Sequence, residues 1–560
     1  MNGAKVSSNR GRYRNIAKSL FAATCLAWLS GSAHADADRN NLLVSTSYYG
    51  GSIDTVIVGQ ELAYQMYDAS GKLVSPPPAA ITAIANGAYN NVFRNDTVDG
   101  SFGVTSGITL ETFNTANNKQ TGTYDITGTL AQQGIQLVTS FSSKSELSLN
   151  VSLDGNAVTF VGYDAAINQL DISNANTVAV VDFTNPTYNF APNAPRAIGQ
   201  INLSDGSLQV IDTNAYSGNN GRAVVLANGE YYLAGNAGNS GKNPKPKNAT
   251  LDALSANTGV QMLDPATATA SGDAYNTTVV GEQVCPACVG TGTGNQYGYS
   301  VTQYGYPADK TGKDDNFRGL TVFNNTLYVT KGSGSNGIDT VFQVGDTGAL
   351  ANGGTIPTNA PITVLPGFPT ALADTAGHPF GIWFADSNTL YVADEGDGSA
   401  TPDSYAGLQK WTFDGTKWKL AYILTNGLNL GDSYIVYGYL NVDGSVATTS
   451  TGDGVLRSYQ TSTGGLRNIT GKINADGTVT IYAVTSTVSD QSITGDQGAD
   501  PNKLVTITDD LSFTTSARAA NERFTDVQTA AYGQVLRGVA LIEANQWPKQ
   551  GRPKPGKGQS

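Results

Sequence analysis

Residues 318–330 read RGLTVFNNTLYVT, an apolar run, a tight polar turn and a second run that carries an aromatic side chain. Four more copies of this pattern occur, with their turns at Asp154-Gly155, Asn228-Gly229, Ser387-Asn388 and Asp476-Gly477. Asn/Asp-Gly pairs supply the positive φ angles of a two-residue turn, so each copy predicts a β-hairpin. A hairpin that recurs without helices between copies indicates radially repeated sheets, as in a β-propeller.

The two ends of the chain predict one further sheet. Residues 41–49 (NLLVSTSYY) read as the second strand of a hairpin without a first, and residues 536–542 (LRGVALI) read as the missing partner. Pairing the two would close the ring and remove exposed sheet edges. Together with the five hairpins and a weak copy at residues 92–114, this predicts an all-β fold. We expect a single β-propeller of seven blades, with six or eight as alternatives, closed by its N- and C-terminal strands and carrying long loop insertions.

The remaining segments predict an exported protein. Residues 1–35 combine a basic start, a short apolar core and the small-x-small sequence Ala33-His34-Ala35, as in a signal peptide. The propeller is expected over residues 36–547, with a long insertion at about 235–316. Residues 548–560 are basic and rich in Pro and Gly, which predicts a disordered tail.

The composition of the chain limits the classes of partner that it can bind. The formal net charge is −12, which argues against nucleic acid and anionic membranes as general partners. No later apolar run is long enough to span a membrane. We therefore expect a secreted protein, extracellular or periplasmic, and a monomer. Beyond the leader, Cys285 and Cys288 remain in a Cys-Pro-Ala-Cys turn, for which a local structural disulfide is favoured over a redox or metal role.

Two stretches resemble a known family at the level of single blades. Residues 318–330 and residues 379–394 (PFGIWFADSNTLYVAD) are similar to blades of the NHL, YVTN and SMP-30-like propeller group. The resemblance implies that the first strand of each hairpin starts near the central channel on one face. It implies no particular activity, because this fold serves enzymes, binding modules and surface proteins alike.

On that basis, cationic side chains are expected to ring one mouth of the channel. The strand starts carry Arg222, Arg318, His378, Arg467 and Arg537. Guanidinium groups recognise carboxylates and phosphates with two parallel hydrogen bonds. The four arginines are therefore predicted to bind an anionic small molecule or a polysaccharide. The alternative is structural, because an arginine before a strand can also pair with an aspartate of the neighbouring blade.

The loops after the second strands are expected to face the same pocket. Asp394, Glu395 and Asp397 place three carboxylates within four residues, a set that suits Ca²⁺ through hard oxygen ligands, although an acidic turn is more often simply solvated. His378 and Lys331 would then move a proton beside the metal. No cofactor other than calcium is expected.

Other chemistries lack their residues. His378 is the one histidine beyond the leader, which excludes metal sites built on several imidazoles. No Gly-x-Ser-x-Gly elbow precedes a helix, and no glycine-rich loop has the setting of a nucleotide site. Three functions stay open: a secreted binding protein for an anionic or carbohydrate ligand, a secreted divalent-cation-dependent lyase, lactonase or phosphoester hydrolase, and an extracellular interaction scaffold without pocket chemistry.

Overall fold

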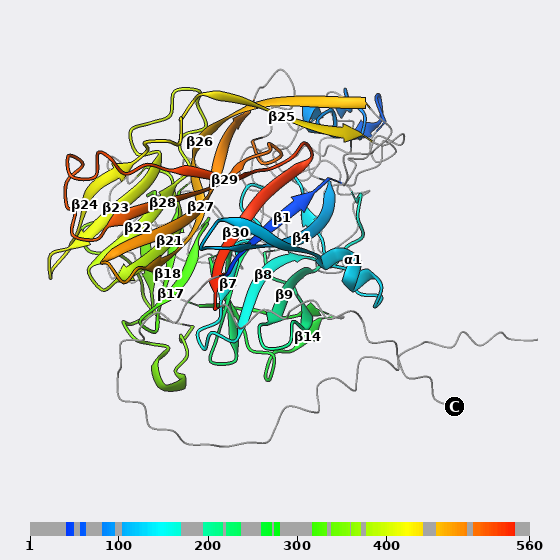
Figure 1. The fold of residues 1–560 in the computed structure, drawn as a ribbon. Helices are drawn as coiled ribbons and strands as arrows, with labels where there is room; N and C mark the ends of the chain where they lie inside the picture. The colour runs from blue at the N-terminus through cyan, green and yellow to red at the C-terminus, as the bar shows by residue number, and fades with distance from the viewer. Residues whose placement is uncertain are drawn as a thin grey trace, which may run out of the picture. The chain divides into compact units, whose positions relative to one another are not determined.

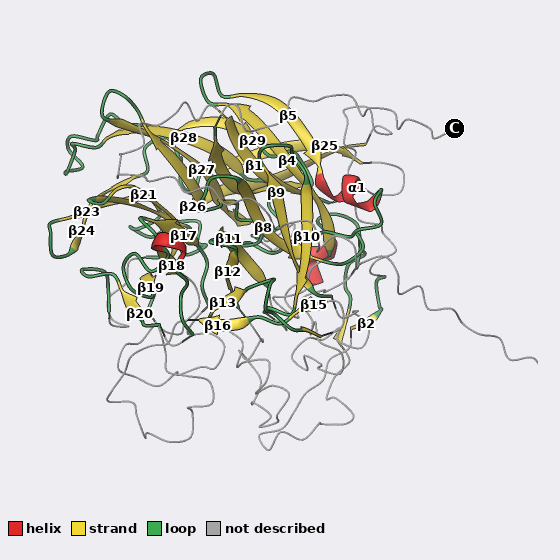
Figure 2. Ribbon diagram, turned by 90° about the horizontal axis from the view of Figure 1, so that it is seen from below, coloured by secondary structure: helices red, strands yellow, loops and turns green. Residues whose placement is uncertain are grey.

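The structure is a computed structural model. It describes residues 41–49, 57–62, 81–95, 104–169, 194–216, 220–236, 259–271, 274–280, 316–332, 338–358, 360–370, 377–440, 455–489 and 497–543, and the statements below concern these residues. They are almost all strand, loop and turn (Figure 2).

Six multi-stranded sheets, here numbered as blades in chain order, make up the propeller. Blade 1 joins both ends of the described chain in the order β30 (Gln534–Ile542), β1 (Asn41–Tyr48), β4 (Thr105–Asn114) and β5 (Lys119–Asp125), with β6 (Thr139–Ser140) beside β4. Blade 2 runs β7 (Asn150–Val151), β8 (Ala157–Tyr163), β9 (Arg196–Asn202), β10 (Leu208–Thr213), β15 (Ala274–Tyr275), β14 (Ala270–Ser271). Blade 3 runs β11 (Gly221–Ala227), β12 (Glu230–Gly235), β13 (Val260–Leu263), β16 (Thr278–Val280).

The second half of the chain forms three more blades. Blade 4 runs β17 (Leu320–Phe323), β18 (Thr326–Lys331), β19 (Thr340–Val344), β20 (Ile362–Val364), and blade 5 runs β21 (Pro379–Asp386), β22 (Thr389–Asp394), β23 (Gly407–Phe413), β24 (Trp418–Leu424). Blade 6 runs β25 (Ser433–Leu440), β26 (Val455–Ile473), β27 (Thr478–Ser489), β28 (Lys503–Asp510), β29 (Thr525–Thr529). Outside the blades lie β2 (Glu61–Leu62), β3 (Ile81–Thr82), α1 (Ile126–Ala131), η1 (Val92–Asn95) and η4 (Ala351–Gly353).

All five predicted hairpins are present as antiparallel pairs: β7–β8, β11–β12, β17–β18, β21–β22 and β26–β27. Their turns adopt the expected backbone where the sequence supplies it. Asn228 and Gly229 have φ angles of 54° and 91°, and Asn324 and Asn325 have 47° and 57°. Gly and Asn tolerate this left-handed region at low cost, which is why these pairs stand at the turns.

The predicted pairing of the two chain ends is confirmed, whereas the count of seven blades is wrong. β1 and β30 lie side by side in Figure 1, with Leu42 opposite Leu541 and Val44 opposite Val539. The weak copy at 92–114 is not a separate blade, because β4 pairs with β1 in the same sheet. Residues 92–95 form a 3₁₀ turn in place of the expected first strand. One sheet was therefore counted twice, and six blades result.

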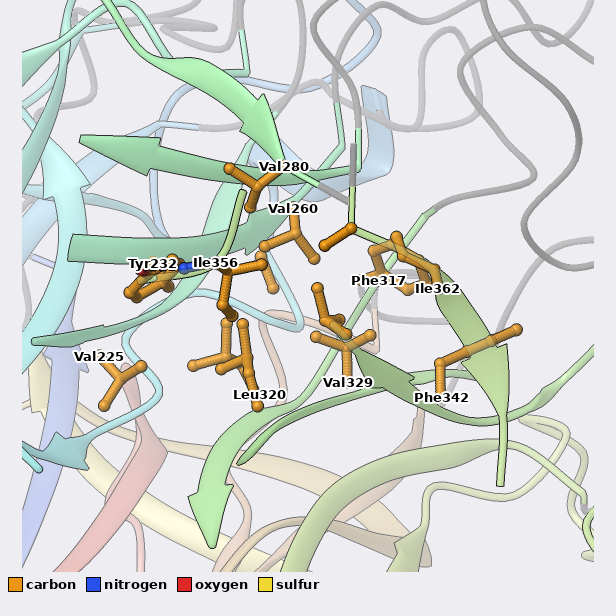
Figure 3. Packing of buried hydrophobic residues seen from close by; sticks show 14 of the residues in the cluster. Val225, Tyr232, Val260, Val280, Phe317, Leu320, Val329, Phe342, Ile356 and Ile362 are labelled. Carbon is orange, nitrogen blue, oxygen red and sulfur yellow. Dashed lines mark hydrogen bonds between the residues drawn. The ribbon is translucent and has the colours of Figure 1, made fainter. Parts of the chain in front are cut away.

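The core lies in the seams between blades. Figure 3 shows the seam of blades 3 and 4, where Val225 and Tyr232 meet Leu320, Val329 and Phe342. All five side chains are buried. Alternate residues of each strand face opposite seams, so nearly every inner-strand side chain enters a core, which explains the continuous apolar runs in the sequence.

One strand from each blade lines an axial cavity of about 280 Å³. The lining comes from β7, β11, β17, β21, β26 and β30 and the residues next to them. Two lining residues directly follow a predicted arginine, Gly319 after Arg318 and Asn468 after Arg467. Arg318 and Arg467 therefore lie next to the lining of this cavity.

Some predictions concern residues outside the described part of the chain. These are the signal peptide at 1–35, the Cys285–Cys288 disulfide and the tail at 548–560. The expected insertion at 235–316 is described in part, and there it supplies β13 to β16 to blades 2 and 3. Among the described residues, no helix has the length and apolarity needed to cross a membrane.

Candidate functional site

The four predicted arginines lie in or just before the inner strands. Arg222 lies in β11, Arg467 in β26 and Arg537 in β30, while Arg318 lies two residues before the first residue of β17. Each is at most 9% exposed. A buried arginine must have its charge and its N–H donors satisfied, so the partners of each one decide its role.

Two Arg-Gly pairs show why the sequence has glycine beside the cation. A Cβ at Gly319 would lie 2.1 Å from the carbonyl oxygen of Phe380, and a Cβ at Gly538 would lie 2.2 Å from that of Leu147. Both distances are too short for any side chain. Glycine thus lets the backbone of the neighbouring blade approach the residue next to each arginine closely.

Arg318 and Arg467 share one carboxylate, that of Glu395 at the end of blade 5's second strand. Arg467 Nε lies 3.1 Å from Glu395 Oε2. Burial opposes ionisation of Glu395, but Arg318 and Arg467 outweigh it and hold the pKa of Glu395 at about 2. Arg318 also donates to Ser145 Oγ at 3.0 Å. Glu395 is therefore a fixed negative charge between two cations.

Arg222 lies beside this pair, and its hydrogen bonds to other described residues go to an amide and a carbonyl oxygen, not to a carboxylate. Its Nη1 donates to Asn316 Oδ1 and, at 2.7 Å, to the carbonyl of Phe317. Burial and the charge of Arg318 lower the pKa of Arg222. Among the described residues, Arg222 Nε has no acceptor, and neither polar side-chain atom of the buried Asn236 has a partner. Buried polar groups without partners are rare and mark this place as a candidate binding site.

Arg537 holds a loop segment, residues 141–146, against the same end of the inner strands. Its guanidinium donates to the carbonyls of Phe141 and Ser143 and, through Nε, to Ser47 Oγ at 3.1 Å. Ser143 Oγ accepts from Asn220 of blade 3 at 2.7 Å. Because Ser145 of this segment also binds Arg318, the segment spans from blade 1 to blades 3 and 4.

Lys331 is not free for proton transfer in this conformation. Its fully buried Nζ lies 2.8 Å from Asp339 Oδ1. Burial raises the pKa of Asp339, and Lys331, His378 and Arg318 act in the opposite direction. Asp339 thus links Lys331 electrostatically to His378.

His378 lies between two aspartates. Its Nδ1 is 3.0 Å from Asp403 Oδ2, and its backbone N–H donates to Asp394 Oδ2 at 2.7 Å. The Asp403 contact raises the pKa of His378 to about 9, although burial opposes this. Burial raises the pKa of Asp394 to about 7. Ligand atoms of His378, Asp394 and Asp403 all lie within 4.8 Å of one another, an arrangement that offers one nitrogen and two carboxylates to a metal ion.

The predicted calcium ligands have separate partners. Asp394 Oδ1 accepts from the N–H of Gly396 at 2.9 Å, Glu395 binds Arg467, and Asp397 accepts from the N–H of Ser399 at 2.9 Å in an exposed turn. Adjacent strand residues point to opposite sides, which explains why Asp394 and Glu395 diverge. The structure brings Asp394 together with His378 and Asp403 instead.

Three contributors were missed from the sequence: Asp403, Asn236 and Lys144. Lys144 donates to Gln497 at 3.0 Å and helps to lower the pKa of Glu395. Asp403 and Lys144 lie outside the hairpin pattern that identified the arginines. Signals existed for two of the three residues. Asn236 directly follows the second strand β12, where the pattern predicts pocket residues, and Asp403 follows the acidic turn by six residues in a Thr-Pro-Asp-Ser stretch that is typical of a loop.

Comparisons with known proteins do not assign the chain to a family. No protein-family model matches it, and no curated protein matches its sequence. A hypothetical selenium-binding protein from Sulfolobus tokodaii aligns over 91% of this chain and 96% of its own, at 10% identity and a TM-score of 0.31. The β-propeller domain of the Trilobed protease from Pyrococcus furiosus aligns over 68% of this chain and 98% of its own, at 9% identity and a TM-score of 0.23. Pseudomonas fluorescens PhoX, solved with vanadate, aligns over 70% of this chain and 80% of its own, at 10% identity and a TM-score of 0.30.

At these identities and scores the matches assign no activity. The β-propeller stands on the chain's own six blades, and membership of the NHL, YVTN and SMP-30-like group stays a prediction.

Proposed function

We propose that the protein is a secreted β-propeller that binds an anionic ligand, a small carboxylate or phosphate or an acidic polysaccharide, at the inner-strand end where Arg222, Arg318 and Arg467 gather. The ligand's anionic group would accept from the guanidinium groups and from the amide of Asn236. Segment 141–146 would form part of the wall.

A buried cluster of three arginines carries this proposal. Arg318 lies within electrostatic reach of both Arg222 and Arg467, and the carboxylate of Glu395 acts on all three. Glu146 also acts on Arg222, and Asp339, which already pairs with Lys331, acts on Arg318. Buried like charges destabilise a fold unless a counter-charge is supplied. The chain as a whole is acidic, so this cationic cluster departs from its general composition. An anionic ligand would supply the counter-charge and the acceptor that Arg222 Nε lacks.

A ligand screen by titration calorimetry tests the proposal. Uronic acid oligosaccharides and phosphate esters form the anionic arm, and neutral oligosaccharides of equal length form the control arm. We expect binding in the anionic arm that weakens as salt is added, because charged contacts are screened. Equal binding of neutral and anionic sugars would refute an arginine-based site.

A second candidate function rests on the His378, Asp394 and Asp403 cluster. These side chains suit a divalent cation, which would polarise an anionic substrate beside Arg318. Lys331 and His378 would then hold or move a proton, once the Asp339 and Asp403 contacts are exchanged for substrate. This supports the alternative of a cation-dependent lyase, lactonase or phosphoester hydrolase.

Elemental analysis of the purified protein distinguishes the two. A bound divalent ion that is lost in Asp403→Asn but kept in Asp414→Asn, an exposed aspartate at a turn, favours the enzyme. Activity on lactones or phosphate esters should then disappear with the same variant. Retention of ion and activity in Asp403→Asn would exclude this cluster as the metal site.

A further inference from the structure

A lysine and an aspartate face each other inside the seam of blades 5 and 6. Lys410 lies in β23 and Asp509 in β28, and Lys410 Nζ is 2.7 Å from Asp509 Oδ2. Both side chains are 0% exposed. Burying a charged pair away from water costs desolvation free energy, so a reaction that leaves both groups uncharged is favoured there.

Two tyrosines bind the same carboxyl group. Tyr391 O–H donates to Oδ2 of Asp509, and Tyr422 O–H donates to Oδ1 at 2.5 Å. Lys410 Nζ also donates to Tyr422 Oη at 2.9 Å and to the carbonyl of Asp510 at 2.8 Å. Both oxygens of Asp509 thus have a phenolic donor, the arrangement that stabilises negative charge on oxygen during addition to a carboxyl carbon.

Glu522 completes the cluster. Its Oε1 accepts from the N–H of Asp510 at 2.9 Å, while its buried Oε2 has no hydrogen-bond donor among the described residues. Burial and the neighbouring Asp509 raise the pKa of Glu522, which favours the protonated form of this carboxyl group. A protonated carboxyl group beside Asp509 can give a proton to this site and take one back.

We propose that Lys410 and Asp509 form an isopeptide bond by themselves in the folded protein. A proton first passes from the Lys410 ammonium to the Asp509 carboxylate, which leaves an amine and a carboxylic acid. The amine nitrogen attacks Cγ of Asp509, and the carbonyl oxygen carries the charge while Tyr391 and Tyr422 hydrogen-bond the carboxyl oxygens.

The second half of the reaction needs one acid and one base. Glu522 gives its proton to the departing hydroxyl, the C–O bond breaks, and one water leaves. The Glu522 carboxylate then takes the proton that the nitrogen releases. The products are a secondary amide and water, Glu522 ends as it began, and no oxidant or co-substrate is consumed.

The geometry favours this step over a permanent ion pair. Lys410 Nζ already contacts the carboxyl group of Asp509, and hydrogen bonds from Tyr391 and Tyr422 fix that carboxyl group. Little conformational entropy is therefore lost when the bond forms. The amide N–H that results can keep the hydrogen bond to the Asp510 carbonyl. The bond would tie blade 5 to blade 6 in the interior, independently of any ligand at the arginines.

Intact mass spectrometry of the full-length secreted chain, reduced and denatured, tests the proposal. The mass should be lower by one water than the mass calculated for the observed N-terminus. A tryptic digest should contain a branched peptide that joins the Lys410 and Asp509 segments, without cleavage after Lys410. The full calculated mass, with cleavage after Lys410, would overturn the proposal whatever the variants do.

Variants separate the chemistry from packing. Glu522→Gln keeps the size of the side chain but removes the acid and base, so it should restore the full mass. Lys410→Arg should do the same, whereas Asp526→Asn, at an exposed aspartate paired with Lys503, should keep the loss of water. Loss of water in folded Glu522→Gln would refute the role assigned to Glu522.

Discussion

His378 carries the clearest pH dependence in the candidate site. The Asp403 contact raises its pKa from 6.5 to about 9 in the folded protein. Because the folded value lies above the unfolded one, the pair stabilises the fold fully below pH 6.5 and loses its contribution as pH rises through about 9. We predict that the wild-type melting temperature decreases as the pH is raised from 6.5 to about 9, and that this decrease is smaller in His378→Gln. Superimposable curves would contradict the pairing.

The sequence predicted the arginines and missed their neighbours for a physical reason. Arg318 and Arg537 repeat at the same place of a hairpin pattern, so the pattern transfers their position from blade to blade. Asp403, Asn236 and Lys144 sit in loops or at a strand end whose paths no periodicity specifies. The divergence of Asp394 from Glu395 follows from strand alternation and was predictable.

At the scale of elements, the seams between blades should dominate stability. Phe342 of β19 is fully buried against Phe317, with ring centroids 5.7 Å apart. We predict that Phe342→Ala lowers the free energy of unfolding by about 3–5 kcal/mol in urea titrations, because a cavity remains. Leu420→Ala in β24, where the side chain is 36% exposed, should change it by about 0.5 kcal/mol or less. Equal effects would refute the seam as the core.

The hairpins were predictable because turn residues and apolar runs are local signals. The blade count was not, since it depends on how β1, β4 and β30 pair across the length of the chain. Strand pairing at long range has no local signature beyond alternation. The weak copy at 92–114 therefore looked like an independent unit.

At the scale of the whole molecule, β30 from the C-terminal end of the described chain pairs with β1 from its N-terminal end in blade 1. Deleting residues 536–560 removes β1's partner and exposes Leu42 and Val44, so we predict a large drop in melting temperature. Deleting residues 548–560 alone removes nothing from the described core and should leave the melting temperature unchanged. Similar melting temperatures for both truncations would refute a stabilising role for the terminal pairing.

The distribution of charge over the molecule underlies the central proposal: an acidic chain buries arginines beside its axial cavity, and we propose that they bind an anion there. The most direct measurement compares Arg318→Ala with Arg523→Ala, an exposed arginine, in calorimetric titration with the best anion from the screen. Removing one buried charged partner costs about 1.5–3 kcal/mol, so Arg318→Ala should bind roughly tenfold more weakly or worse, with an unchanged melting temperature. Unchanged affinity combined with a lower melting temperature would make Arg318 a structural link between blades and contradict the claim.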